Sequence, residues 1–325
     1  MKYYGRAPLR IGLGGGGSDI KEHFSIHGGA VVNLTINKYA HVFIEENSSN
    51  SILLRSFDLE IKEEYKSIED CEKNISLSSL KLHIAAILVL KKKYNIDLSK
   101  ISISTYVDAP PGSGLGSSST LMVCIIGSIL EFFKIRLDSK ELALLAYSIE
   151  REFLGLKGGM QDQFSAAFGG CNLIQFNADS SINVNKIKLS KNFIKEFEYS
   201  FSLFDMGKSR DSSKIIDSQI KNMKKEKNVE DLNYLKEIAY KMEEFVRMEN
   251  LAEIHNTILE SWAKKKNLSS KISSDNIESI LNFIQENGGL SCKISGAGGG
   301  GFIFVGSKPE KKMHLINKLK EHYNL

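Results

Sequence analysis

The spacing of apolar positions predicts a strand, a loop and a buried helix near the middle of this chain. Residues 30–45 alternate loosely and are rich in β-branched and aromatic types, which predicts strands. Residues 79–93 carry leucine and isoleucine among lysines, which predicts a helix. Residues 101–107 alternate with a period of two and predict another strand, and the apolar run 121–133 predicts a buried helix. The polar segment 110–120 therefore connects a strand to a helix.

The chain continues with further helices and strands on either side of an irregular segment. Residues 139–153 predict a helix, and residues 169–176 predict a turn into a strand. The polar segment 177–190 follows. At 325 residues the chain is long enough for two domains of roughly 100–200 residues each. We therefore expect an N-terminal domain of residues 1–180 and a C-terminal domain of residues 181–325.

The C-terminal part predicts a small sheet with several helices. A strand is expected at about 199–204, and helices are expected over much of 211–286. The strand pair 290–294 and 302–305 is joined by a glycine-rich loop. The expected fold class is α+β in two layers.

Composition and charge remove several classes of partner. The chain is 42% hydrophobic and 25% charged, and its net charge of +4 is small for its length. The lysine runs 91–93 and 264–266 have no interleaved aromatic residues, so we expect solvated helix faces and no nucleic-acid partner. The four cysteines lack metal-ligand spacing, which favours reduced, buried thiols. No apolar run can cross a membrane and no signal core is visible, so we expect a cytoplasmic protein. The oligomeric state stays open.

Glycine and serine dominate the segment 110–120. Its glycines let backbone N–H groups close on an anion, and the start of a helix supplies unpaired N–H groups and partial positive charge. A serine-capped helix after a Pro-Gly turn is the alternative, but a cap needs one serine and this loop has three in succession. No Gly-Lys-Ser/Thr closes it, so it is not a Walker A motif. The predicted triphosphate-binding residues are Pro111, Gly112, Ser113, Gly114, Leu115, Gly116, Ser117, Ser118 and Ser119.

A second glycine run, residues 12–17, also fits the dinucleotide-binding pattern GxGxxG. That fingerprint needs an acidic residue roughly twenty positions further on to bind the ribose. Residues 31–37 read Val-Val-Asn-Leu-Thr-Ile-Asn and contain no carboxylate. The sequence therefore argues against a nicotinamide-dependent oxidoreductase.

Three separated motifs resemble those of the GHMP small-molecule kinases, in the family order. They are the run 7–10 leading into the glycines and Ser-Asp of 14–19, the loop 110–119, and the glycine loop 295–301. The resemblance covers nearly the whole chain. It implies ATP and Mg²⁺ as cofactors and a two-domain fold. In that fold the N-terminal domain is of mixed βαβ type, and the C-terminal domain is a ferredoxin-like α/β sandwich.

The resemblance also implies roles for five residues. Ser118 and Glu150 match the hydroxyl and carboxylate that hold Mg²⁺, and Asp162 matches the catalytic aspartate that accepts or orients the acceptor proton. Arg10 matches the electrostatic stabiliser of the transferred phosphoryl group, and Asp19 matches a ligand of sugar hydroxyls. Alternatives stay open, because Asp162 could cap a helix, Glu150 could be solvated, and Arg10 and Asp19 could lie at the surface.

The residues of these motifs resemble those of one branch of the family. Enzymes of that branch phosphorylate the anomeric oxygen of D-glycero-α-D-manno-heptose 7-phosphate or of fucose. We expect the heptose 7-phosphate to be the acceptor and the 1,7-bisphosphate to be the product. This choice implies a second anion site for the 7-phosphate, with Lys157, Lys208 and Arg210 as candidates, although the last two could simply precede a helix cap. The other expected acceptor contacts are Gly16, Gly17, Ser18, Gly159, Gly298 and Gly299.

Two alternatives remain. One is a fucokinase-like enzyme acting on an unphosphorylated sugar. The other is a sugar sensor that keeps the fold without turnover. If the acceptor is the heptose 7-phosphate, we expect only small-molecule partners, namely a sugar phosphate and ATP. The third glycine loop could also be a tight turn between strands, although its four consecutive glycines exceed the need of a hairpin.

Overall fold

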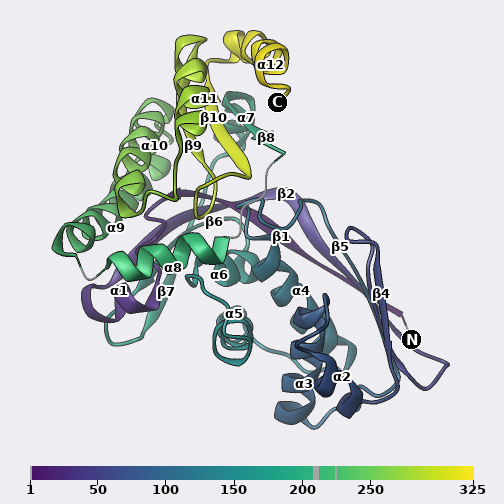
Figure 1. Cartoon of the computed structure of the whole chain (residues 1–325). Helices are drawn as coiled ribbons and strands as arrows, with labels where there is room; N and C mark the ends of the chain where they lie inside the picture. The colour runs from purple at the N-terminus through teal and green to yellow at the C-terminus, as the bar shows by residue number, and fades with distance from the viewer. Residues whose placement is uncertain (1, 208–211, 224) are drawn as a thin grey trace.

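The computed structural model describes residues 2–207, 212–223 and 225–325 and contains two β-sheets with helices packed around them (Figure 1). The larger sheet has seven strands in the order β4-β3-β5-β2-β6-β7, with β1 paired to β2. All of its strand pairs are antiparallel except β3 with β5. The strands are β1 (Lys2–Gly14), β2 (Gly29–Glu46), β3 (Ile52–Ser56), β4 (Ile61–Tyr65), β5 (Ile101–Val107), β6 (Cys171–Phe176) and β7 (Ile182–Ile187).

One face of this sheet is covered by helices of the N-terminal part. The central helix α4 packs against β1 and β2, and its apolar side chains Met122, Ile125, Ile126 and Ile129 are fully buried. Burial on all sides explains why this segment is apolar without a polar stripe. The helices here are α1 (Lys21–His27), α2 (Ile68–Asn74), α3 (Lys81–Tyr94), α4 (Ser117–Phe132), α5 (Ser139–Ser148), the π-helix η1 (Ile149–Phe153) and α6 (Gln161–Phe168).

Most of the C-terminal part lies on the opposite side of the larger sheet, where α9 packs against β1 and β2 (Figure 1). Its small antiparallel sheet has the order β8-β10-β9. The described residues thus contribute three strands, where a complete ferredoxin-like unit has four. The elements are α7 (Lys191–Ser200), β8 (Phe201–Asp205), α8 (Ser212–Asn222), α9 (Glu226–Arg247), α10 (Leu251–Lys265), η2 (Lys266–Leu268), α11 (Asp275–Glu286), β9 (Gly289–Ile294), β10 (Phe302–Ser307) and α12 (Pro309–Tyr323).

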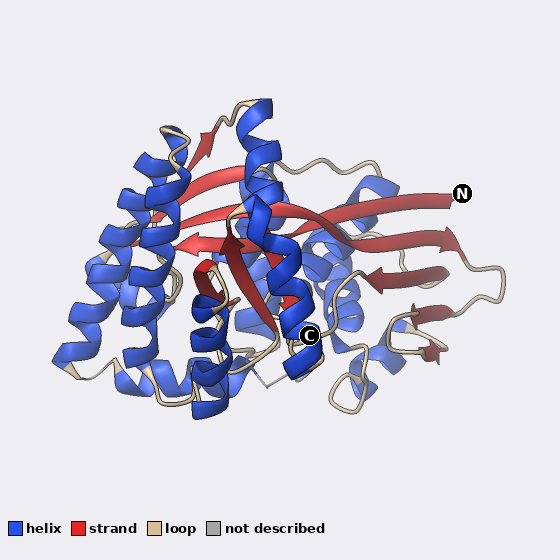
Figure 2. Cartoon of the chain, turned by 90° about the horizontal axis from the view of Figure 1, so that it is seen from above, coloured by secondary structure: helices blue, strands red, loops and turns tan. Residues whose placement is uncertain are grey.

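The two parts meet along the long strands. Figure 2 shows β1, which begins at the N mark, running across the molecule. This strand packs against α4 of the N-terminal part and α9 of the C-terminal part. Gly15 follows β1 at a φ of 84°, and a Cβ there would lie 2.0 Å from the carbonyl oxygen of Ala30 and 2.8 Å from Ala239 of α9. Only glycine fits between the strand and the helix at this point. This packing fixes the position of the first glycine run.

Several expected elements are confirmed. The strand expected at 101–107 is β5, the helix expected at 79–93 is α3, and the strands expected at 30–45 form one continuous strand, β2. The strand-loop-helix order around the loop 110–120 is also present. All four cysteines are buried and free, and burial raises the pKa of each thiol to about 12. No helix in the described ranges is long and apolar enough to span a bilayer.

Other expectations were wrong in detail. The segment 177–190 is not irregular throughout, because β7 lies within it and pairs with β6. The strand expected from residue 199 begins at Phe201, since α7 continues to Ser200. The helix expected at 139–153 ends in the π-helix η1. The domain boundary at residue 180 stays a prediction, and because β7 belongs to the larger sheet we propose that it lies after Ile187.

Candidate active site

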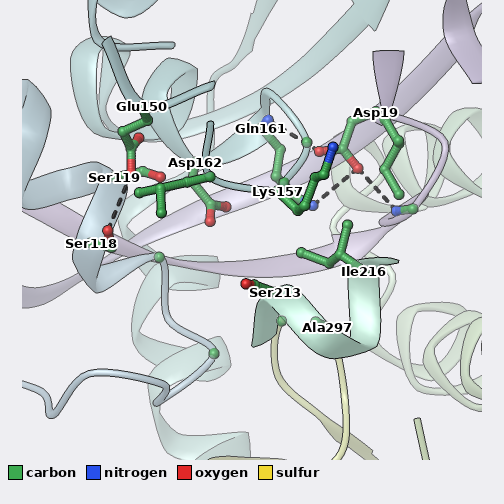
Figure 3. A pocket seen from close by; sticks show the side chains of 18 of the residues that line it. Asp19, Ser118, Ser119, Glu150, Lys157, Gln161, Asp162, Ser213, Ile216 and Ala297 are labelled. Atoms are coloured by element: carbon green, nitrogen blue, oxygen red, sulfur yellow. Dashed lines mark hydrogen bonds between the residues drawn. The ribbon is translucent and has the colours of Figure 1, made fainter. Parts of the chain in front are cut away.

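A cavity of about 530 Å³ opens where the glycine-rich segments of both parts meet (Figure 3). Residues of α8 and α10 and of the third glycine loop form its C-terminal wall. Figure 3 shows Asp162 with the Ser118–Glu150 contact to one side and Asp19 to the other. The residues expected from the sequence that line this cavity are Arg10, Gly17, Asp19, Pro111, Gly112, Gly114, Gly116, Ser117, Ser118, Ser119, Glu150, Lys157, Gly159 and Asp162.

The loop before α4 has the backbone geometry of an anion cradle. Gly112, Gly114 and Gly116 all have φ near 78°, a left-handed conformation that favours glycine. Gly116 is the N-cap residue of α4, and no side chain caps this end of the helix. The first N–H groups of α4 therefore face the cavity through Ser117 and Ser118, with the positive end of the helix dipole behind them. This end of the cavity suits a phosphate chain.

Two residues of the loop have structural contacts instead. Ser113 and Leu115 are buried and do not line the cavity. The carbonyl oxygen of Ser113 accepts a hydrogen bond from the backbone N–H of Phe302 on β10, at 3.1 Å. The carbonyl oxygen of Leu115 accepts one from the backbone N–H of Arg10, also at 3.1 Å. These bonds fasten the loop to strands of both parts.

The buried Arg10 and the partly exposed Asp162 form an ion pair beside this loop. Arg10 Nε donates to Asp162 Oδ1 at 2.7 Å, and Arg10 Nη2 lies 2.5 Å from the same oxygen. Arg10 Nη1 donates to the carbonyl oxygen of Gly114 at 2.6 Å. Asp162 is in the first turn of α6 but makes no capping bond there. Because the arginine contacts fall on Oδ1, Asp162 Oδ2 is the oxygen that can accept a proton from a bound acceptor.

Asp19 is fixed at the other end of the cavity. Its Oδ1 accepts from the backbone N–H of Gly17 at 2.9 Å and from Gln161 Nε2 at 3.2 Å, and its Oδ2 accepts from the backbone N–H of Gln161 at 3.2 Å. A Cβ on Gly159 would lie 1.9 Å from Asp19 Oδ2, so a glycine is required there. These contacts fix the position of the buried carboxylate in the cavity wall.

Glu150 and Ser118 lie together where metal ligands are expected. Glu150 is fully buried in the π-helix η1, whereas its neighbour Glu152 is exposed. Ser118 Oγ donates to Glu150 Oε1 at 3.2 Å, and Gln163 Nε2 donates to Glu150 Oε2 at 2.6 Å. In the described ranges no three His, Cys, Asp or Glu residues form a metal-binding group. One hydroxyl and one carboxylate fit Mg²⁺, which keeps waters and takes oxygens from substrate phosphates.

Several predicted acceptor contacts lie elsewhere. Gly16 lines a neighbouring cavity of about 20 Å³. Ser18 is buried, and its hydroxyl bonds to the backbone of Gly15 and Ala30. Gly298 and Gly299 pack against Ile272, whose carbonyl oxygen accepts from the Gly299 N–H at 2.7 Å, and the third loop instead presents Gly296 and Ala297 to the cavity. Lys208 and Arg210 lie outside the described residues.

Sequence reasoning missed part of the cavity wall. Gln161 donates a hydrogen bond to the carboxylate of Asp19, and Gln163 donates one to the carboxylate of Glu150. The position of both glutamines directly beside Asp162 in the sequence was the signal that could have indicated a role at the site. Lys265 was expected on a solvated helix end, yet it lines the cavity. The remaining unexpected lining residues come mostly from α8 and the turn before α6: Ile20, Arg151, Leu156, Gly158, Ser213, Ile216 and Gln219.

Comparisons with known proteins agree with this fold and site. The family description "GHMP kinases N terminal domain" matches residues 81–170, and "GHMP kinases C terminal" matches residues 241–325. A D-glycero-alpha-D-manno-heptose 7-phosphate kinase from Campylobacter jejuni is 35% identical over 97% of this chain and 92% of its own length. An L-fucokinase/L-fucose-1-P guanylyltransferase from Bacteroides fragilis is 26% identical over 97% of this chain but only 36% of its own length.

A solved structure is similar as well. The crystal structure of a D-glycero-D-manno-heptose 1-phosphate kinase from Bacteroides thetaiotaomicron matches 99% of this chain and 93% of its own, with a TM-score of 0.82 and 30% identity. The two-part fold and these similarities thus define a small-molecule kinase. The chain belongs to the GHMP kinase family. Kinases of this family imply ATP as the phosphoryl donor.

Proposed function

We propose that this protein transfers the γ-phosphoryl group of ATP to the anomeric hydroxyl of D-glycero-α-D-manno-heptose 7-phosphate and forms the 1,7-bisphosphate. The observation that carries this proposal is the single cavity shared by the phosphate loop and the Arg10–Asp162 pair. The similarity to a relative named for this activity supports the choice of acceptor. We further propose that the enzyme works in the cytoplasm and supplies nucleotide-activated heptose for surface glycans.

The phosphate loop would bind the donor. Backbone N–H groups of the loop residues that line the cavity, namely Gly112, Gly114 and Gly116 to Ser119, would surround the phosphate chain at the start of α4. Ser118 and Glu150 would hold Mg²⁺, which neutralises charge on the phosphate oxygens when it is bound. The carboxyl group of Glu150 is already oriented by Gln163, and such support keeps a ligand in place.

Asp162 and Arg10 would act on the reacting groups. Asp162 Oδ2 would orient the anomeric hydroxyl and accept its proton as the phosphoryl group is transferred. Arg10 would stabilise charge on the equatorial phosphoryl oxygens with its fixed set of N–H donors. Its contacts to Asp162 Oδ1 and Gly114 also hold the base against the loop. The pair therefore positions both reactants.

The acceptor would extend from Asp162 toward Asp19, whose carboxylate accepts from sugar hydroxyls. Lys157 lines the cavity and is our candidate for the terminal phosphate, with Lys208 and Arg210 as further candidates outside the described residues. A fucokinase-like activity is the second candidate, favoured by the similarity to the Bacteroides fragilis protein. A sensor without turnover is disfavoured, because Arg10, Ser118, Glu150 and Asp162 meet in one cavity.

A panel of acceptors tests the proposal. Release of ADP is measured with heptose 7-phosphate, mannose 6-phosphate, fucose and galactose, and we expect the highest kcat/KM with the heptose 7-phosphate. Lys157→Met should then raise the KM for that sugar by about 10- to 150-fold, the value of one charge-assisted contact, and leave the KM for ATP nearly unchanged. Weak activity on heptose lacking the phosphate should be the same in both proteins. A wild-type preference for fucose would replace our proposal with the fucokinase-like alternative.

Replacing the predicted metal ligand should change the Mg²⁺ requirement. We expect Glu150→Gln to need about 10- to 100-fold more Mg²⁺ for half-maximal rate, because a buried anionic ligand becomes neutral. Glu152→Gln is a matched control, since Glu152 is two residues away and exposed. Rates are measured against free Mg²⁺ at saturating ATP. Identical Mg²⁺ curves for the two variants would remove Glu150 from the metal site.

A further inference from the structure

Three consecutive lysines span the end of α10 and the first residue of η2, and the middle one, Lys265, has a different environment from its neighbours. Lys264 Nζ lies 3.6 Å from Asp231 Oδ1, and Lys266 Nζ donates to Glu278 Oε2 at 2.7 Å. Both therefore have carboxylate partners on the C-terminal part itself. Lys265 Nζ instead donates to the backbone carbonyl oxygen of Gly296 at 2.6 Å, in the third glycine loop. Its side chain thus points toward the cavity shared with the N-terminal part.

The Lys265 ammonium group is surrounded by the groups proposed to act on the substrates. Burial lowers its pKa to about 8, Asp19 and Asp162 oppose the shift, and Arg10 adds to it. A Cβ placed on Gly16 would lie 3.4 Å from Lys265 Nζ, so the ammonium lies beside the first glycine run. A cation from the C-terminal part therefore lies close to two carboxylates on the opposite wall.

The hydrogen bonds of this ammonium group are incomplete. The group carries three N–H donors. Among the described residues, the hydrogen bond to the carbonyl oxygen of Gly296 accounts for one of them. No direct ion pair joins Lys265 to Asp19 or Asp162 in this part of the chain, although both influence it electrostatically. A buried charge with unused donors is costly, so a ligand oxygen at this point would be stabilised.

We propose that Lys265 binds the acceptor, donating to a ring hydroxyl oxygen that lies between Asp19 and Asp162. The inference rests on the proposed function, in which this cavity holds a sugar. A hydroxyl group is both a donor and an acceptor. Asp19 can only accept and Lys265 can only donate, so the two together complete the hydrogen bonds of one or two neighbouring hydroxyls. Because Lys265 comes from α10, acceptor binding then joins the two parts of the protein.

Kinetics of three variants test this role, using the sugar that wild-type protein phosphorylates best in the panel. We expect Lys265→Met to raise the acceptor KM by about 10- to 100-fold, with the KM for ATP within about threefold of wild type. Lys265→Arg keeps the charge and should recover part of the acceptor affinity. Lys264→Met is the matched control from the same helix and should behave as wild type. Calorimetric titration of the acceptor without ATP should give the same order.

The pH dependence separates binding from a merely structural role. The charged groups facing Lys265 are Arg10, Asp19, Asp162 and Lys293, and burial together with Lys265 lowers the pKa of Lys293 to about 7. With a pKa of about 8, Lys265 loses its positive charge progressively as pH rises through that value. The wild-type acceptor KM should therefore rise as pH increases through about 8. This step should be absent in Lys265→Arg, whereas any step near pH 7 from Lys293 should remain.

The opposite outcome is well defined. If Lys265→Met raises both KM values equally, or lowers only the melting temperature, Lys265 is a tether for the Gly296 loop and the proposal is wrong. An unchanged pH profile in Lys265→Arg would lead to the same conclusion. A wrong heptose assignment can be told apart from a wrong role for Lys265. The first would appear as a wild-type preference for another sugar, and the Lys265 variants would still be compared with wild type on that sugar.

Discussion

Asp162→Asn is expected to lower kcat by about 10²- to 10⁴-fold while the KM for ATP changes little. The asparagine keeps the size of the side chain, and its carbonyl oxygen can still accept from Arg10. It cannot accept the proton of an acceptor hydroxyl, because an amide is not a useful base. Steady-state rates at saturating ATP and acceptor measure the loss. Equilibrium binding of ATP and the melting temperature show whether the variant is folded.

A small effect would lead to a different assignment. Activity of Asp162→Asn within a few-fold of wild type would make Asp162 a structural partner of Arg10, whose charge it balances at 2.5–2.7 Å. The capping alternative is less consistent with the contacts, because Asp162 makes no capping bond at the start of α6. A large loss with unchanged ATP binding therefore points to the proton-accepting role.

The parts of the fold that local sequence could predict are those with strong patterns. The strand 101–107 alternates with a period of two, and the following glycines and serines have few roles other than a turn or an anion cradle. The structure has the strand β5 and a tight loop after it, with φ near 78° at Gly112, Gly114 and Gly116. The resemblance to the family assigned roles at one site to Arg10, Asp19 and Asp162, which periodicity alone could not indicate, and the three residues line one cavity.

The elements that sequence reasoning missed have weak local patterns. β7 contains apolar residues at 182, 184 and 187 among asparagine and lysine, a composition typical of a short edge strand. The strand expected at about 199–204 was placed too early, because α7 continues to Ser200 with Phe193 and Phe197 on its buried face. In both cases the tertiary neighbours decide the conformation.

The missed site residues depend on contacts between distant segments. Lys265 stands in a run of three lysines, and nothing in that run distinguishes the middle residue. Its role follows from the place where α10 ends, against the third glycine loop. Ser18 and Gly298 likewise belong to motifs but have structural contacts. The Ser18 hydroxyl donates to the backbone carbonyl oxygen of Ala30, and Gly298 packs against Ile272. A motif therefore predicts which loops gather at a site, but not which atoms face the ligand.

Arg10→Met is expected to lower kcat by about 10³-fold, the scale of an arginine that stabilises a transferred phosphoryl group. The substitution removes this stabilisation and also leaves Asp162 and the carbonyl oxygen of Gly114 without their donors. Arg10→Lys should recover little, because an ammonium group cannot make the three contacts of the guanidinium. Arg6→Met is a matched control from the same strand, since Arg6 lies over the ring of Tyr39 outside the cavity.

The double variant Arg10→Met with Asp162→Asn measures the coupling of the pair. Because both residues act on one transfer step and touch each other, the losses should not add, and the double variant should be about as slow as the slower single variant. Rates are compared in a double-mutant cycle at saturating substrates. Additive losses would mean that the two residues contribute independently. An Arg10→Met rate within about tenfold of Arg6→Met would assign Arg10 to holding the phosphate loop in place.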